Sequence, residues 1–291
     1  MTAPFADRLA EAVIRTGAAT CVGLDPHLDA LPASLRAGLR VDTPADRAAA
    51  AAVVERWSLG VLDAIVGVAA AVKPQVAFFE VLGAPGVAVL ERVVAAARAR
   101  GLLVLLDAKR GDIGTTAEAY ARWALDPDGP VAADAVTLSP YLGPESLAPF
   151  VARADRGAGL FVLVRTSNPG AGVWQLGGDA PVAGRVADWV TEANAPRRGA
   201  AGLGPVGAVV GATLPGEIAG WRARMPDAWL LLPGFGAQGA GPKDVAAAFR
   251  SDGLGALVVS ARGVTFGPEA DDWQAGVAAR AQAFARALRE G

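Results

Sequence analysis

Eight short apolar runs, most of them followed by an alanine-rich segment, constrain this chain more than any other feature. The runs are apolar throughout, as parallel strands covered on both faces of a sheet require. They occupy residues 20–25, 71–79, 102–107, 135–139, 160–165, 206–211, 229–233 and 256–260. Eight such units in 291 residues predict an α/β fold of the (β/α)8 or TIM-barrel type. The functional site of such a barrel lies at the carboxyl ends of the strands.

Helical patterns flank these runs at both ends of the sequence. Residues 5–15 have helical spacing with Phe5, Leu9 and Val13 on one face, and they predict a helix ahead of the barrel. A final helix is indicated by apolar residues at spacings of three and four. This stripe consists of Trp273, Val277, Ala281, Phe284 and Leu288.

No low-complexity linker or break in composition divides the sequence, so residues 1–291 are predicted to form a single (β/α)8-barrel domain with an N-terminal helix. Two segments rich in Gly, Pro and Ala, residues 26–46 and 168–204, are expected to form loops or short helices over one rim of the barrel.

The charge balance and the rare residues exclude several classes of function. A formal net charge of −2 gives no overall basic field for nucleic acid or anionic lipid. One cysteine, Cys21, and one histidine, His27, exclude an internal disulfide and any multi-Cys or multi-His metal site. We interpret Cys21 as a core residue and His27 as a loop residue. An enzyme built from this chain would therefore rely on carboxylates and lysines.

The sequence gives no indication of export or membrane insertion. Asp7, Arg8 and Glu11 stand where a signal peptide needs an apolar stretch. The longest apolar region, residues 59–72, is interrupted by Asp63 and is too short to span a bilayer. A cytoplasmic location is therefore expected.

The third run leads into the motif D-x-K-x-x-D at Asp107, Lys109 and Asp112. Side chains two residues apart on a strand point the same way, so Asp107 and Lys109 should project together from the strand's carboxyl end. Asp112 follows Gly111, where the chain turns, and its carboxylate can approach from elsewhere, even from another subunit. A solvated turn has the same spacing, but the preceding apolar residues and a nearby phosphate site favour function.

A lysine also interrupts the second run. Lys73 is expected to be buried, and a buried ammonium needs a partner. Asp25, at the end of the neighbouring first run, is the predicted partner.

The last two runs end in groups that suit a phosphate dianion. The seventh leads into the loop PGFGAQG, and the backbone N–H groups of Gly234 and Gly236 with the Gln238 amide could donate to phosphate oxygens. Arg262, after the eighth run, supplies a guanidinium. The loop also matches G-x-G-x-x-G, but with only one further strand after it no six-stranded dinucleotide domain can follow, so an NADP oxidoreductase is a weak alternative.

With these residues in place, the chain closely resembles the orotidine 5′-phosphate decarboxylase family, particularly its longer bacterial branch. The resemblance covers about residues 5 to 265. The motifs that carry it are VGLDP at 22–26, VKPQVAFFE at 72–80, DAKRGDIGTT at 107–116, TLSPYLG at 137–143, RTSNPG at 165–170 and PGFGAQG at 233–239. It implies a TIM-barrel enzyme of pyrimidine biosynthesis that converts orotidine 5′-phosphate to UMP and CO2 without a metal or an organic cofactor.

The resemblance also implies roles for the charged residues. Asp25 and Lys73 would hold a ribose hydroxyl. Asp107, Lys109 and Asp112 would form the charged array at the reacting carbon, with Lys109 protonating C6. In the family the last aspartate comes from the partner subunit of a homodimer.

The remaining implied contacts complete the substrate site. Thr116 would also cross the subunit interface, to the ribose. Ser167 would contact the pyrimidine amide, and Gln238 and Arg262 would bind the 5′-phosphate.

Two further alternatives remain open. A Mg²⁺-dependent sugar-phosphate decarboxylase or aldolase of the same superfamily carries the same D-x-K-x-x-D motif. It needs an acidic ligand near the end of the second strand, where this chain has Lys73 and only Glu80 as a nearby carboxylate. A non-catalytic phosphate-binding barrel would give no reason for a lysine set between two aspartates.

Overall fold

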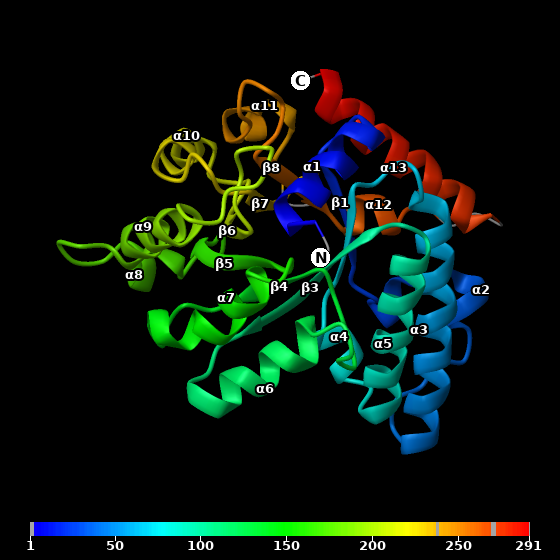
Figure 1. The fold of residues 1–291 in the computed structure, drawn as a ribbon. Coiled ribbons are helices and arrows are strands. Elements are labelled where there is room, and N and C mark those ends of the chain that lie inside the picture. Colours follow the sequence, from blue (N-terminus) through cyan, green and yellow to red (C-terminus); the bar gives the residue numbers. More distant parts are fainter. Residues whose placement is uncertain (1–2, 237–238, 269–271, 291) are drawn as a thin grey trace.

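The computed structural model describes residues 3–236, 239–268 and 272–290, and it confirms the predicted barrel (Figure 1). Eight parallel strands pair in chain order, and the last pairs with the first to close the sheet. The strands are β1 Thr20–Leu24, β2 Ala71–Pro74, β3 Leu103–Arg110, β4 Ala135–Leu138, β5 Gly159–Arg165, β6 Val206–Val210, β7 Leu230–Pro233 and β8 Ala256–Ser260.

Helices cover the outside of the strands, and α3 packs against both α5 and α13 (Figure 1). The α-helices are α1 Phe5–Thr16, α2 Ala33–Arg36, α3 Pro44–Ile65, α4 Ala77–Glu80, α5 Ala84–Ala99, α6 Gly114–Leu125, α7 Ala148–Ala154, α8 Ala171–Gln175, α9 Val182–Asn194, α10 Pro215–Arg224, α11 Pro242–Val245, α12 Arg262–Thr265 and α13 Trp273–Glu290. Three short 3₁₀ helices are η1 Leu28–Ala30, η2 Pro144–Leu147 and η3 Ala246–Ala248.

The apolar side chains form two layers because successive residues of a strand point to opposite faces. On β1, Cys21 belongs to the cluster inside the barrel, and Val22 belongs to the cluster between the strands and the helices. The inner cluster also includes Phe5 and Leu9 of α1, and the Phe5 ring meets Phe161 edge-on with centroids 6.0 Å apart. The predicted N-terminal helix therefore packs its apolar face onto the barrel interior.

Two segments differ from the sequence-based expectation. The strand expected over 71–79 ends at Pro74, and the chain turns after Val76 donates its N–H to the Asp107 carbonyl (3.2 Å). Phe79 is then buried on α4, which explains why this apolar run resembled a longer strand. The segment 168–204 contains α9, which packs on β5 and β6 outside the barrel and does not lie over a rim.

Among the residues that the structure describes, no helix combines the length and apolar character needed to cross a membrane.

Candidate active site

The alternation that builds the inner core also aims polar side chains into the mouth of the barrel. Ala71, Leu105 and Ala135 are inner residues of β2, β3 and β4. Two residues further along the same strands, at their carboxyl ends, are Lys73, Asp107 and Thr137. These three polar residues are at most 6% exposed, and their side chains meet in one cluster.

Asp107 is the centre of this cluster because four side chains of the described residues donate hydrogen bonds to its carboxylate. Its Oδ2 atom accepts from Lys73 Nζ at 2.5 Å and from Gln75 Nε2 at 3.0 Å. Its Oδ1 atom accepts from Lys109 Nζ at 2.5 Å and from Thr137 Oγ1 at 2.9 Å. The expectation that Asp107 and Lys109 project together is confirmed.

The charges in the cluster support one another. Burial alone would raise the pKa of Asp107, but Lys73 and Lys109 outweigh it and hold that pKa well below its usual range. Burial alone would lower the pKa of Lys73, but Asp107 and Asp25 outweigh it and raise that pKa above its usual value. The site therefore keeps a carboxylate and a buried ammonium in fixed positions.

The predicted pairing of Lys73 with Asp25 is wrong in its details. The ion-pair partner of Lys73 is Asp107, and the buried Oδ1 atom of Asp25 has no hydrogen-bond partner among the described residues. Burial raises the pKa of Asp25 despite the attraction of Lys73. Asp25 thus presents an acceptor without a donor beside the cluster, which suits a hydroxyl group of a ligand.

Asp112 and Thr116 lie outside the cluster. The Asp112 carboxylate accepts the N–H of the adjacent Ile113 (2.8 Å) and makes no hydrogen bond or ion pair with Asp107 or Lys109. Thr116 is exposed in the first turn of α6. The expectation that the chain turns Asp112 away after Gly111 is therefore met.

The loop after β7 is closed by its own backbone. Gly236, at a positive φ of 75°, donates its N–H to the Ala240 carbonyl at 2.9 Å, so the expectation that this group faces a phosphate is not met here. Gly234 also has a positive φ, 111°, and is buried. Gln238 lies outside the described residues. Arg262 is exposed at the start of α12, beyond the carboxyl end of β8.

A side-chain clamp holds the segment that contains Ser167. Gln175 accepts the Thr166 N–H through Oε1 (2.9 Å) and donates from Nε2 to Thr166 Oγ1 (2.7 Å). Thr166 Oγ1 in turn donates to Asn168 Oδ1 at 2.6 Å. A Cβ atom on Gly211 would lie 2.8 Å from Ser167 Cβ, so this glycine makes room for the segment.

Two residues of the cluster, Gln75 and Thr137, were not predicted from the sequence. Gln75 lies two residues beyond Lys73, in the spacing that places side chains on one face of a strand. Thr137 is a hydroxyl residue inside the apolar run AVTL. The signal for Thr137 was present, because a buried polar residue in an apolar strand needs a partner.

Cys21 and His27 have the structural roles that the sequence predicted. Cys21 is fully buried, and burial raises the pKa of its thiol to about 12. The His27 ring packs against Phe78, with centroids 4.4 Å apart, and faces Phe266 at 6.1 Å.

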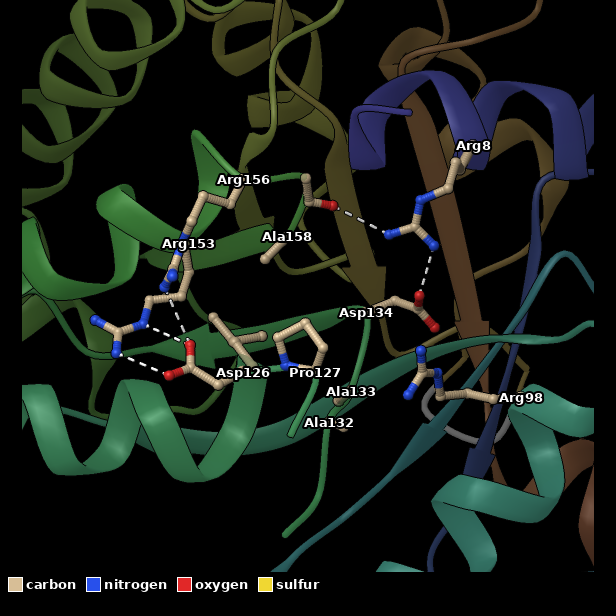
Figure 2. A pocket seen from close by; sticks show the side chains of 12 residues that line it. Arg8, Arg98, Asp126, Pro127, Ala132, Ala133, Asp134, Arg153, Arg156 and Ala158 are labelled. Carbon is tan, nitrogen blue, oxygen red and sulfur yellow. Dashed lines mark hydrogen bonds and ion pairs between the residues drawn. The ribbon is translucent and has the colours of Figure 1, made fainter. Parts of the chain in front are cut away.

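A cavity of about 210 Å³ lies at the opposite end of the barrel, beside the residues that precede β4 and β5 (Figure 2). Three of its arginines are held by protein carboxylates: Arg8 pairs with Asp134 at 2.5 Å, and Arg153 and Arg156 pair with Asp126 at 2.9 Å and 3.1 Å. We interpret this network as structural, because its charges are compensated within the chain.

Comparison with known proteins identifies the family of this chain. The profile of the orotidine 5′-phosphate decarboxylase / HUMPS family matches residues 20–272. The chain belongs to this family. It is 47% identical to an orotidine 5′-phosphate decarboxylase of Rhodopirellula baltica, over 92% of this chain and 90% of the relative. A relative of the same name from Deinococcus radiodurans is 46% identical, over 91% and 90% of the two chains.

The family assignment extends to the three-dimensional structure. A crystal structure from Streptomyces avermitilis superposes with a TM-score of 0.83 and 42% identity, covering 99% of this chain and 96% of the other. The Asp107–Lys109 motif lies within the matched region of the family.

Proposed function

We propose that this chain is an orotidine 5′-phosphate decarboxylase, which releases CO2 from orotidine 5′-phosphate and forms UMP in pyrimidine biosynthesis. The observation that carries the proposal is the pair of ammonium groups, Lys73 and Lys109, that one buried carboxylate holds 2.5 Å from its two oxygens. The family includes both orotidine 5′-phosphate decarboxylases and HUMPS enzymes, so the charged groups of the site must indicate which of the two reactions they suit.

The proposed reaction breaks the bond between C6 and the carboxylate and leaves an electron pair on C6. No adjacent carbonyl can delocalise that pair as an enolate, so the enzyme must supply the stabilisation electrostatically. Lys109, held by Asp107, places its ammonium where the pair develops and then transfers a proton to C6. Solvent returns a proton to the Lys109 amine, and the Asp107 charge remains throughout.

Repulsion between Asp107 and the substrate carboxylate provides part of the driving force. Two like charges about 4 Å apart at an effective dielectric near 20 cost roughly 4 kcal/mol. Enzymes remove about 8 to 23 kcal/mol of barrier, so repulsion alone is too small. Binding of the distant 5′-phosphate, for which Gln238, Arg262 and the backbone N–H of Gly234 are the proposed ligands, supplies the rest.

The other proposed substrate contacts follow from the resemblance to the family. We assign a ribose hydroxyl to Lys73 and Asp25, whose buried Oδ1 atom has no hydrogen-bond partner in the described part of the chain. We assign the pyrimidine amide to Ser167, on the segment that Gln175 clamps. No metal or organic cofactor takes part in the proposed reaction.

We also propose that the active form is a cytoplasmic homodimer of single-domain subunits, in which Asp112 and Thr116 complete the partner's site. Ile113, Tyr141 and Leu142 support the proposal because they are apolar, are 57%, 78% and 43% exposed, and follow β3 and β4 near the site. Apolar groups exposed together on one rim suit burial against a second subunit.

The Mg²⁺-dependent sugar-phosphate reaction suits this site less well. Two ammonium groups beside Asp107 repel a divalent cation, and Glu80 is paired with Arg110. The test is decay of the substrate's ultraviolet absorbance with EDTA-treated protein, run beside a hexulose 6-phosphate with Mg²⁺. Turnover of orotidine 5′-phosphate in EDTA is expected. A Mg²⁺ requirement, or turnover of the sugar phosphate alone, would contradict the proposal.

A further inference from the structure

Thr137 on β4 faces an irregularity in β3. Leu106 pairs with Val136 and Arg110 pairs with Leu138, so three residues of β3, Asp107 to Lys109, lie opposite the single residue Thr137. A strand with extra residues bends and loses part of its ladder of backbone hydrogen bonds. The Thr137 hydroxyl replaces the lost backbone hydrogen bonds, because it accepts N–H groups from this part of β3.

The Thr137 hydroxyl uses its full hydrogen-bonding capacity on this turn. Its Oγ1 atom accepts the N–H groups of Ala108 at 3.0 Å and Lys109 at 2.9 Å. It donates its own proton to Asp107 Oδ1 at 2.9 Å. A hydroxyl offers one donor and two acceptor positions, so this buried group, only 1% exposed, is satisfied by these three partners.

Lys109 needs this support because of its backbone conformation. Its φ of 46° lies in the left-handed region, which non-glycine residues seldom adopt. That conformation folds the Lys109 side chain back so that Nζ reaches Asp107 Oδ1 at 2.5 Å. The same Oδ1 atom accepts the Thr137 proton, so one hydroxyl fixes both the carboxylate and the turn that presents the lysine.

We propose that Thr137 is a positioning residue, which aligns the Lys109 ammonium and the Asp107 carboxylate for the reaction at C6. This inference rests on the proposed function. Thr137 lies behind Asp107 and acts through it, so its loss should lower kcat and leave KM nearly unchanged.

Three variants test the assignment. Thr137→Val keeps the side-chain shape without the hydroxyl, and Thr137→Ser keeps the hydroxyl. Thr20→Val is the matched control, because Thr20 is equally buried on β1 and its hydroxyl donates to the Val68 carbonyl (3.2 Å) at the other end of the barrel. For each variant kcat, KM, the Tm and the Kd of UMP are measured.

Thr137→Val should lower kcat by about 10-fold to 100-fold, the range for a lost hydrogen bond to a charged or buried group, with KM and UMP binding within about threefold of the wild type. Thr137→Ser should recover most of the loss, and Thr20→Val should keep the wild-type kcat.

A Thr137→Val enzyme with unchanged kcat would overturn the assignment, as would a serine variant as slow as the valine variant or an equal loss in Thr20→Val. A folded wild type without turnover would overturn the proposed function and this inference with it. An active wild type with an unaffected valine variant would overturn the inference alone.

Discussion

Lys73 and Asp107, which are 34 residues apart in the sequence, form a buried ion pair of 2.5 Å at the mouth of the barrel. The neighbouring strands β2 and β3 bring the two residues together. Each side chain points inward because it lies two residues after an inner residue of its own strand. The pair fixes the carboxylate that also binds Lys109. In the proposed mechanism, stability and catalysis therefore depend on the same carboxylate.

Removing the charge of Asp107 should destabilise the fold and stop turnover. Asp107→Asn leaves the Lys73 ammonium buried without its counter-charge, and breaking a buried pair in this way costs about 3 to 5 kcal/mol. Chemical denaturation of the variant beside Asp42→Asn, whose carboxylate is 65% exposed in its pair with Arg40, measures the difference. A variant that kept its turnover rate and lost only substrate affinity would exclude charge repulsion from the mechanism.

The stabilisation of the fold by the ionised Asp107 carboxylate should decrease as the pH falls. The pKa of Asp107 is lower in the folded protein than the value of about 3.9 expected in the unfolded chain. The stabilisation is therefore complete above about pH 4 and is lost as the pH falls toward the folded pKa. The difference in unfolding free energy between the wild type and Asp107→Asn should shrink from pH 7 to pH 3. An increase over that interval would contradict the assignment.

Ionisation of Asp25 should have the opposite effect and destabilise the fold. Burial raises its pKa in the folded state, so its ionisation opposes folding above the pKa of the unfolded residue. Asp25→Asn is expected to raise the Tm at pH 7, to lose that gain near pH 3, and to weaken binding of UMP. A lower Tm with normal UMP binding would show that the unpartnered carboxylate is not held for a ligand.

Mixing two inactive variants tests the contribution of the second subunit. If Asp112 acts in the partner's site, a mixed dimer of Lys109→Ala and Asp112→Asn contains one site with both native residues. An equal mixture of subunits should then recover about one quarter of the wild-type activity, because half of the dimers are mixed and each has one intact site. No recovery after subunit exchange, checked by size-exclusion chromatography of tagged subunits, would place Asp112 in its own subunit's site or outside catalysis.

The sequence was enough to predict the barrel and the Asp107–Lys109 pair, because both depend on local alternation of buried residues. It did not give the partner of Lys73, since the choice between Asp25 and Asp107 depends on how β1, β2 and β3 are staggered. Thr137 was missed for a related reason. Its role arises from the bulge in β3, where three residues face one, and the run AVTL does not encode the register of its neighbour.

In the proposed mechanism, the Lys109 ammonium protonates C6 of the decarboxylated pyrimidine. The most direct test is to measure by NMR the deuterium at C6 of UMP that the wild type and Lys109→Ala form in D2O. Both proteins are assayed in EDTA, and both are first shown to bind UMP. We expect one deuterium at C6 from the wild type and no product from the variant. Product formation by Lys109→Ala at the wild-type rate, or UMP without deuterium at C6, would contradict it.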